Sequence, residues 1–387
     1  MGWRVDIDQP TYQKYQTIPA GPLRALIDAS IVVNPQGKEG KKPPSFAQVK
    51  MPPSLQCPFH NAERLCQIQV EHGEAYLSST CATFPRNPLT IDHIEESALT
   101  LSCPEAARLV LLNPALLAAD DLAVHHDTWE ENAQGGVQLS TYFWPIREFT
   151  ISLVNNRKYP LWQRLFLLGT FSRRLQGIVD GEIARGIPTL LQGFSAAVAS
   201  GSLRASIETI SADLTLQLGM VLELVKLRTE GEYVSARLVE SVNSFAQGVG
   251  YGPGKTLGDL SSLYAEAYRL YYAPFFLKHP HILENYLVNM IFRKLFPLGQ
   301  VFFEAEAKAE PAKEFAMLAI EFALVKGLLI GVAGCYKKEF STQNVIQTVQ
   351  TACKHFEHNQ AFLTRAYGLL VEKKLDNAHG LTMLLRN

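Results

Sequence analysis

The sequence lacks a surplus of charge of either sign, and it lacks an apolar leader. Its 387 residues include 36 basic and 37 acidic side chains, which gives a formal net charge of −1 at pH 7. Nucleic-acid-binding proteins usually carry a basic surplus, so this class of function is not expected. The polar N-terminus, MGWRVDIDQPTYQKYQ, has no stretch resembling a secretory signal. We therefore expect a cytoplasmic protein.

Long apolar runs are also scarce. The most apolar segment is FAMLAIEFALVKGLLIGVAGC, from Phe315 to Cys335, and it contains Glu321 and Lys326. A charge near the centre of a membrane-spanning helix is costly. This segment therefore predicts a buried core helix, and no membrane association is expected.

The chain shows no alternation of strands and helices and no internal repeat. From about residue 145 the apolar residues instead follow helical spacing, as in YPLWQRLFLLGTFSRRLQGIV and HILENYLVNMIFRKLFPLG. STQNVIQTVQTACKHFE repeats this spacing and begins with Ser341 and Thr342 as candidate caps. Residues 1–115 are rich in proline and glycine, which break helices. We predict a mainly α protein, with an irregular cysteine-rich N-terminal region at 1–115 and a larger α-helical domain at 116–387. Strands should be few, short and N-terminal, for instance around WRVDI.

Cysteine is scarce but unevenly placed. Four of the six cysteines lie within one window of 47 residues, spaced nine, fifteen and twenty-two residues apart. These are Cys57, Cys66, Cys81 and Cys103. Disulfides are uncommon in the cytoplasm, so clustered thiols favour a metal site, and four thiolates can bind zinc or an iron–sulfur cluster. The spacing lacks a C-x-x-C pair, so unrelated buried thiols stay an alternative. The apolar surroundings of Cys335 and Cys353 predict core positions.

Histidine offers two weaker metal-binding hypotheses. AVHHDTW contains His125, His126 and Asp127, but adjacent histidines point in different directions, so a surface turn is expected. His355 and His358 are three residues apart and would share one face of a helix.

The sequence segments around the cysteines resemble those of a known family. CPFHNAERLCQIQVEHGEAYLSSTCATFPR and ESALTLSCPEAARLVLLNP closely resemble the flagellin lysine-N-methylase (FliB) family, and the similarity continues in ENYLVNMIFRKLFPLG and FEHNQAFL. It covers nearly the whole chain. The resemblance implies a cytoplasmic bacterial enzyme that methylates lysine side chains of flagellin, using S-adenosylmethionine and a cysteine-bound iron–sulfur cluster of the 4Fe–4S type. Cys57, Cys66, Cys81 and Cys103 would belong to its cysteine-rich region, with zinc as the alternative metal.

One feature departs from the family pattern. A further close-set group of cysteines lies upstream of a segment like GWRVDID in the family, whereas here GWRVDID begins at position 2. Either the start site is placed too far downstream, or the protein is a truncated family member. Four cysteines are nevertheless enough in number for a site of their own. The alternative function is a non-catalytic, flagellin-binding or metal-stabilised interaction protein.

The implied reaction sets a requirement on the site. A lysine amine attacks a methyl carbon only when it is neutral, and an exposed lysine with a pKa of about 10.4 is almost fully protonated at pH 7. The site must desolvate the amine or place a base beside it. The sequence offers two pairs of candidates: Glu284 with Tyr286 in LENYL, and Glu357 with His358 in FEHN. Structural positions on amphipathic helices are the alternative for each.

Overall fold

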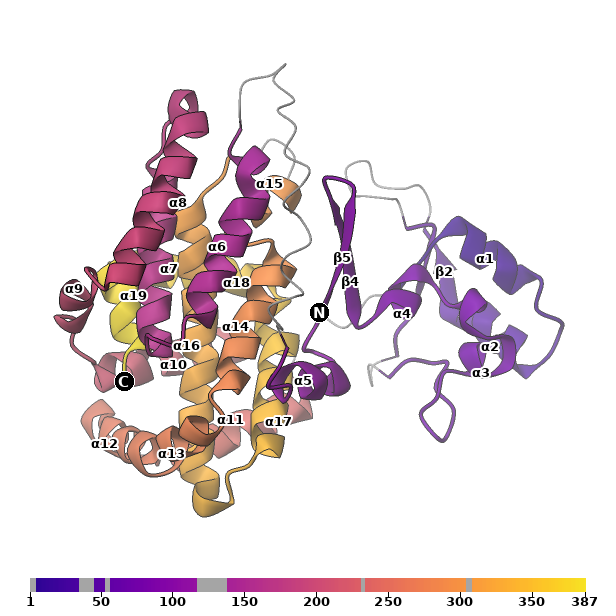
Figure 1. Ribbon diagram of the computed structural model, residues 1–387. Coiled ribbons are helices and arrows are strands. Elements are labelled where there is room, and N and C mark those ends of the chain that lie inside the picture. Colours follow the sequence, from indigo (N-terminus) through magenta and orange to yellow (C-terminus); the bar gives the residue numbers. More distant parts are fainter. Residues whose placement is uncertain (1–4, 35–44, 53–55, 117–137, 231–233, 304–307) are drawn as a thin grey trace. The chain divides into compact units, whose positions relative to one another are not determined.

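The computed structural model describes residues 5–34, 45–52, 56–116, 138–230, 234–303 and 308–387. The chain divides into two compact units, Met1–Ser97 and Ala98–Asn387 (Figure 1). The boundary predicted near residue 115 lies inside the second of these units. AVHHDTW, with its candidate ligands His125, His126 and Asp127, lies outside the described residues.

A small antiparallel sheet and short helices build the first unit. Strand β3 (Ala47–Val49) lies between β1 (Asp6–Ile7) and β2 (Ile31–Val33), with Asp6 opposite Gln48 and Ile31 opposite Val49. β1 falls in the WRVDI segment, as predicted. The helical segments are α1 (Gln9–Gln16), α2 (Pro22–Ser30), α3 (Gln67–His72), η1 (Glu74–Tyr76) and α4 (Ser79–Thr83). α1 begins where the side chain of Asp8 accepts a hydrogen bond from the Thr11 amide, 2.8 Å away.

The core of this unit forms where the sheet packs on the helices. Buried residues such as Ile7, Tyr15, Ile27 and Ala47 make one apolar cluster, against which Cys57, Cys66 and Cys81 pack. A hairpin of β4 (Arg86–Ile91) and β5 (Ile94–Leu99) follows. Its two-residue turn, Asp92 and His93, has positive φ at both positions, as a type I′ turn requires.

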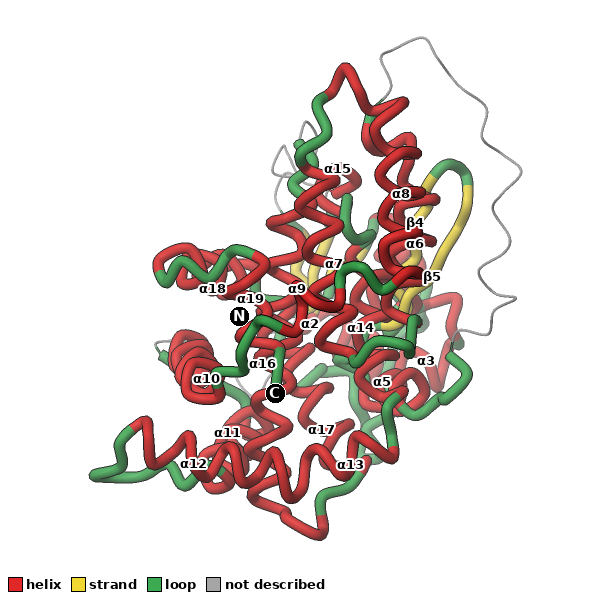
Figure 2. The backbone as a smooth tube through the Cα atoms, turned by 60° about the vertical axis from the view of Figure 1, so that its left-hand side comes forward, coloured by secondary structure: helices red, strands yellow, loops and turns green. Residues whose placement is uncertain are grey.

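One long helix forms the centre of the second unit. α16 (Pro311–Tyr336) contains the apolar run noted in the sequence, and other helices surround it in both views (Figures 1 and 2). By length and composition it could cross a membrane, but 94% of its most apolar window is buried inside the unit. The prediction of a buried core helix is therefore confirmed, and so is the mainly α fold.

Helices from both sides of α16 in the sequence pack against it. These are α7 (Leu161–Gln176), α10 (Leu214–Thr229), α11 (Ala236–Gly248), α12 (Leu257–Ala267), α17 (Thr342–Ala352), α18 (Gln360–Glu372) and α19 (Ala378–Leu385). The remaining helical segments are α5 (Pro104–Leu111), η3 (Leu139–Tyr142), α6 (Phe143–Asn155), η4 (Asp180–Glu182), α8 (Ile183–Ser200), α9 (Arg204–Glu208), η5 (Tyr268–Tyr272), α13 (Ala273–Lys278), α14 (His281–Lys294), α15 (Gly299–Phe303), η6 (Lys337–Glu339) and η7 (Cys353–Glu357).

Three elements of this unit position the candidate site. α14 packs on α5 and α6, and its residues from Ile282 to Ile291 are all buried. α17 begins with a capping box between Ser341 and Asn344, which confirms the predicted start. η7 continues α17 as one π-helical turn, a form that is often found at functional sites.

Candidate functional site

Tyr286 and Glu357 meet in the interior of the helical unit. The Tyr286 hydroxyl, from α14, donates a 2.9 Å hydrogen bond to Oε1 of Glu357, from η7. The Cys353 thiol donates to the same oxygen over 3.1 Å. The other carboxylate oxygen of Glu357 is bound by the guanidinium of Arg293. Both oxygens of Glu357 therefore have partners, and its side chain is only 3% exposed.

The charge of this cluster is fixed by its contacts. Burial alone would raise the pKa of Glu357, but Arg293 and Lys294 outweigh it and hold that pKa below the ordinary value. The pKa values of Tyr286 and Cys353 are well above their ordinary values, first because of burial and then because of the nearby Glu357 charge. Glu357 is thus an ionised acceptor that two protonated groups and a guanidinium surround.

A second buried carboxylate lies on α16. Oε1 of Glu321 is 2.7 Å from the Lys294 ammonium, whereas Oε2 is buried and has no hydrogen-bond partner among the described residues. Burial raises the pKa of Glu321, and Lys294 opposes this shift in part. The raised pKa makes this carboxylate a stronger proton acceptor than an exposed glutamate, and a general base must accept a proton.

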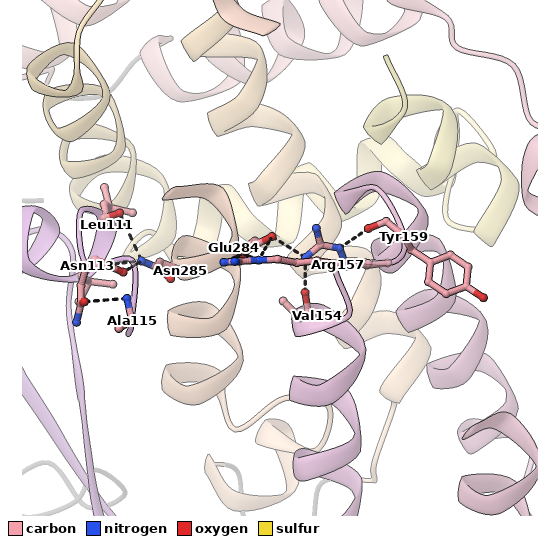
Figure 3. A network of polar contacts seen from close by, with 10 residues as sticks. Leu111, Asn113, Ala115, Val154, Arg157, Tyr159, Glu284 and Asn285 are labelled. Carbon is pink, nitrogen blue, oxygen red and sulfur yellow. Dashed lines mark hydrogen bonds and ion pairs between the residues drawn. The ribbon is translucent and has the colours of Figure 1, made fainter. Parts of the chain in front are cut away.

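Glu284 belongs to a different network (Figure 3). Its two oxygens pair with Arg157 at 2.7 Å and with Arg164 at 2.8 Å. Arg164 also donates to the carbonyls of Val154 and Tyr159. Glu284 therefore connects α14 to the segment between α6 and α7 and to α7 itself. The sequence-based hypothesis paired Glu284 with Tyr286, whereas in the structure Tyr286 contacts Glu357.

The two candidate histidines bind different partners. Nε2 of His358 lies 3.2 Å from the Thr100 hydroxyl, whereas Nε2 of His355 lies 2.8 Å from the Ser235 hydroxyl. Burial, followed by the charge of Arg228, lowers the pKa of His355 to about 4, so this ring is neutral at physiological pH. The described contacts do not place the pair at one metal.

The predicted cysteine ligands are divided between the two units. Cys57, Cys66 and Cys81 are half-buried free thiols of the first unit, and Cys103 precedes α5 in the second. Burial and the neighbouring thiols raise the pKa of Cys57 and of Cys81. Within the described ranges, no three His, Cys, Asp or Glu side chains are placed to hold a metal ion. The four-cysteine ligand set therefore stays a prediction from the resemblance.

Sequence reasoning missed four members of the buried site: Arg293, Lys294, Glu321 and Cys353. A signal existed for Glu321, because an acidic residue interrupts an otherwise apolar run. We used that charge only to argue against a membrane span. Nothing local marks Arg293 and Lys294, because cations are ordinary near the C-terminal end of any helix.

Comparison with known proteins finds a family whose model matches most of the second, helical unit. Residues 147–384 match the model of the FliB lysine N-methylase C-terminal domain. The lysine-N-methylases of Salmonella typhimurium and Salmonella choleraesuis are each 24% identical over 230 residues, which cover 58% of this chain and 54% of theirs. The flagellar biosynthetic protein FliU of Salmonella muenchen is 30% identical over 118 residues, covering 30% of this chain and 67% of FliU.

No solved structure matches the chain. The chain spans about half the length of the curated lysine-N-methylases that it matches. The family model nevertheless covers more than half of the chain and includes every residue of the buried Tyr286–Glu357 and Glu321–Lys294 contacts. The chain belongs to the FliB lysine N-methylase family.

Proposed function

We propose that this chain is a protein-lysine N-methyltransferase that transfers methyl groups from S-adenosylmethionine to lysine side chains of flagellin in the bacterial cytoplasm. The observation that carries the proposal is the family match over residues 147–384. The flagellar substrate is supported by the name of one relative, a flagellar biosynthetic protein.

Glu321 is the group best suited to prepare the lysine amine. The substrate ammonium must lose a proton before its nitrogen can attack. Oε2 of Glu321 is a buried carboxylate oxygen without a hydrogen-bond partner among the described residues, and it can accept that proton. Lys294 holds the other oxygen, which keeps the carboxylate in one orientation. S-adenosylmethionine supplies the electrophilic methyl group. The nitrogen–carbon bond forms as the sulfur–carbon bond breaks.

Glu357 has a positioning role in this proposal. Its oxygens are taken by Tyr286, Cys353 and Arg293, and its lowered pKa makes it a weak base. Through its contacts with Tyr286 and Arg293, Glu357 joins η7 to α14 beside Lys294. This differs from the sequence-based hypothesis, in which Glu357 with His358, or Glu284 with Tyr286, provided the base.

The iron–sulfur cluster stays a prediction from the resemblance. Cys57, Cys66, Cys81 and Cys103 are its proposed ligands, with zinc as the alternative metal. Iron and sulfide analysis of protein purified without oxygen tests this part. Iron with acid-labile sulfide supports it, and metal-free active protein contradicts it.

Transfer of labelled methyl groups to purified flagellin tests the activity. We expect Glu321→Gln to reduce the rate by about 100-fold or more, as loss of a general base does. Glu266→Gln, an exposed glutamate on α12, is the matched control and should keep full activity. A fully active Glu321→Gln protein would rule out the base, and no transfer by the intact chain would rule out the function.

The alternative is a non-catalytic flagellin-binding or metal-stabilised interaction protein. Binding of flagellin without methyl transfer, in protein shown to be folded, would select this alternative.

A further inference from the structure

Lys294 is a lysine of the chain itself that already contacts the carboxylate assigned to activate the substrate. Its ammonium lies 2.7 Å from Oε1 of Glu321. The backbone fixes this position, because α14 ends at Lys294, where Leu295 adopts a left-handed conformation with a φ of 51°. The chain therefore contains the same pairing of a lysine ammonium with a buried carboxylate that methyl transfer to a substrate lysine requires.

The two side chains of this pair differ in exposure. The Lys294 side chain is 26% exposed, whereas the Glu321 side chain is 2% exposed. This leaves the lysine side of the pair open to a methyl donor from solvent and shields the carboxylate from water. Transfer of a proton from the ammonium to the carboxylate replaces two charged groups with two neutral ones, and burial favours neutral groups. The raised pKa of Glu321, which burial causes, supports this transfer.

Other lysines among the described residues lack this setting. Lys226, Lys313 and Lys373 pair with glutamates whose side chains are 59%, 41% and 44% exposed. Water solvates the ions of these pairs, so burial does not favour their neutral forms as it does for Glu321. Lys326 is desolvated, but it is only 6% exposed and is closed to a methyl donor.

We propose that Lys294 is a site of self-methylation, at which the chain transfers a methyl group from S-adenosylmethionine to its own side chain. The Lys294 ammonium gives a proton to Oε1 of Glu321, and the nitrogen lone pair then attacks the methyl carbon. The nitrogen–carbon bond forms as the sulfur–carbon bond breaks, and S-adenosylhomocysteine leaves. Glu321 releases its proton to water. This inference rests on the proposed function.

The product fits the same contact. Methylation of a lysine keeps its positive charge, so an ammonium and a carboxylate face each other again once Glu321 has released its proton. A nitrogen with one or two methyl groups also keeps an N–H that can donate to Oε1. Self-methylation therefore preserves the link between α14 and α16.

Peptide mass spectrometry of the full chain, incubated with isotope-labelled S-adenosylmethionine and without flagellin, tests the proposal. We expect methyl groups at Lys294, labelled or acquired before purification, at an occupancy at least about tenfold above that of Lys226 or Lys373. Lys294→Arg should remove most of the label from the chain, whereas Lys226→Arg should leave it unchanged. Equal labelling of the exposed lysines and Lys294 would overturn the proposal.

A second variant tests whether the transfer occurs within one chain. Glu321→Gln should lower the labelling of Lys294 by about 100-fold, as loss of a general base does. The variant, produced with heavy isotopes and mixed with wild-type protein, should stay unlabelled at Lys294. Full labelling of the variant in the mixture would show that copies methylate one another, which contradicts the role of the internal pair. The measurements on wild type and Lys294→Arg keep the test valid if Glu321→Gln does not fold.

Flagellin methylation by the same preparation separates this inference from the proposed function. Methylated flagellin together with unmodified Lys294 would overturn the inference and leave the function standing. Label at Lys294 without label on flagellin would support the inference and contradict flagellin as the substrate. No label on either would overturn both.

Discussion

Glutamates in similar helical settings acquire different chemistry from their partners. Glu284 binds arginines through both oxygens, and Glu357 binds Arg293 through one oxygen and accepts from Tyr286 and Cys353 through the other. Glu321 has one oxygen without a partner among the described residues. Burial raises the pKa of Glu321, and one oxygen of this carboxylate is open to a proton. Sequence context could not rank them, because what differs is the partner and not the residue type.

Replacing Glu284 should destabilise the fold rather than change the chemistry. Glu284→Gln leaves the Arg164 side chain, 6% exposed, without its carboxylate. Breaking a buried pair from one side costs about 3–5 kcal/mol, and the 60% exposed Arg157 adds little. Urea unfolding should show this loss, while the methylation rate per folded molecule stays near that of the wild type. An equally stable variant would contradict the structural role.

Lys326 should make stability depend on pH in the alkaline range. Its side chain is buried on α16, donates to the Leu385 carbonyl, and has a pKa that burial lowers from 10.5 to about 7. Between pH 7 and 10.5 the unfolded chain holds a proton that the folded chain has released. Unfolding then takes up a proton, so stability rises with pH, by up to about 1.4 kcal/mol per pH unit.

Comparison with Lys326→Met isolates this effect. Residue 326 cannot titrate in the variant. The free energy of unfolding of the wild type, measured relative to that of the variant, should therefore increase steadily as the pH rises from 7 to 10.5. Denaturant unfolding at four or five pH values measures the difference. Parallel curves for the two proteins would show that Lys326 has an ordinary pKa.

At the scale of elements, glycines allow α11 and α16 to pack closely. A Cβ added at Gly248 of α11 would lie 1.7 Å from the Gly331 carbonyl oxygen of α16, and backbone cannot move aside as a flexible side chain does. We expect Gly248→Ala to destabilise the protein by at least about 1–3 kcal/mol. Gly193→Ala in α8 is the control: nothing lies within 4 Å of its added Cβ, so it should stabilise the helix by up to about 1 kcal/mol. Thermal melts that rank the two variants in the opposite order would contradict this crossing.

Much of the helical unit could be predicted from periodicity. The leucine spacing of α7, the apolar run of α16 and the Ser341 cap of α17 are local features, and each helix formed where they indicated. The π-helical turn of η7 was not predicted. The core position predicted for Cys353 is confirmed, since this residue is buried in that turn.

The contacts within the candidate site could not be predicted from the sequence. Tyr286 and Glu357 were both named, but they are 71 residues apart, and their contact depends on how α14 packs beside η7. The sequence instead suggested neighbours along the chain, Glu284 with Tyr286 and Glu357 with His358. The ligand set of Cys57, Cys66, Cys81 and Cys103 stays a prediction, because its members belong to two units.

At the scale of the whole molecule, the two units should unfold separately. The family match at 147–384 lies entirely within the second unit, which has its own buried central helix and its own ion pairs. We expect a fragment of residues 98–387 to fold alone, because its core contains α16 and the helices around it. Calorimetry of the full chain should show two transitions, one of which the fragment reproduces within a few degrees. The full chain is the control for helical content by circular dichroism. A fragment without a cooperative melt would mean that the second unit needs residues 1–97 to fold, and a single transition in the full chain would mean that the two units unfold as one.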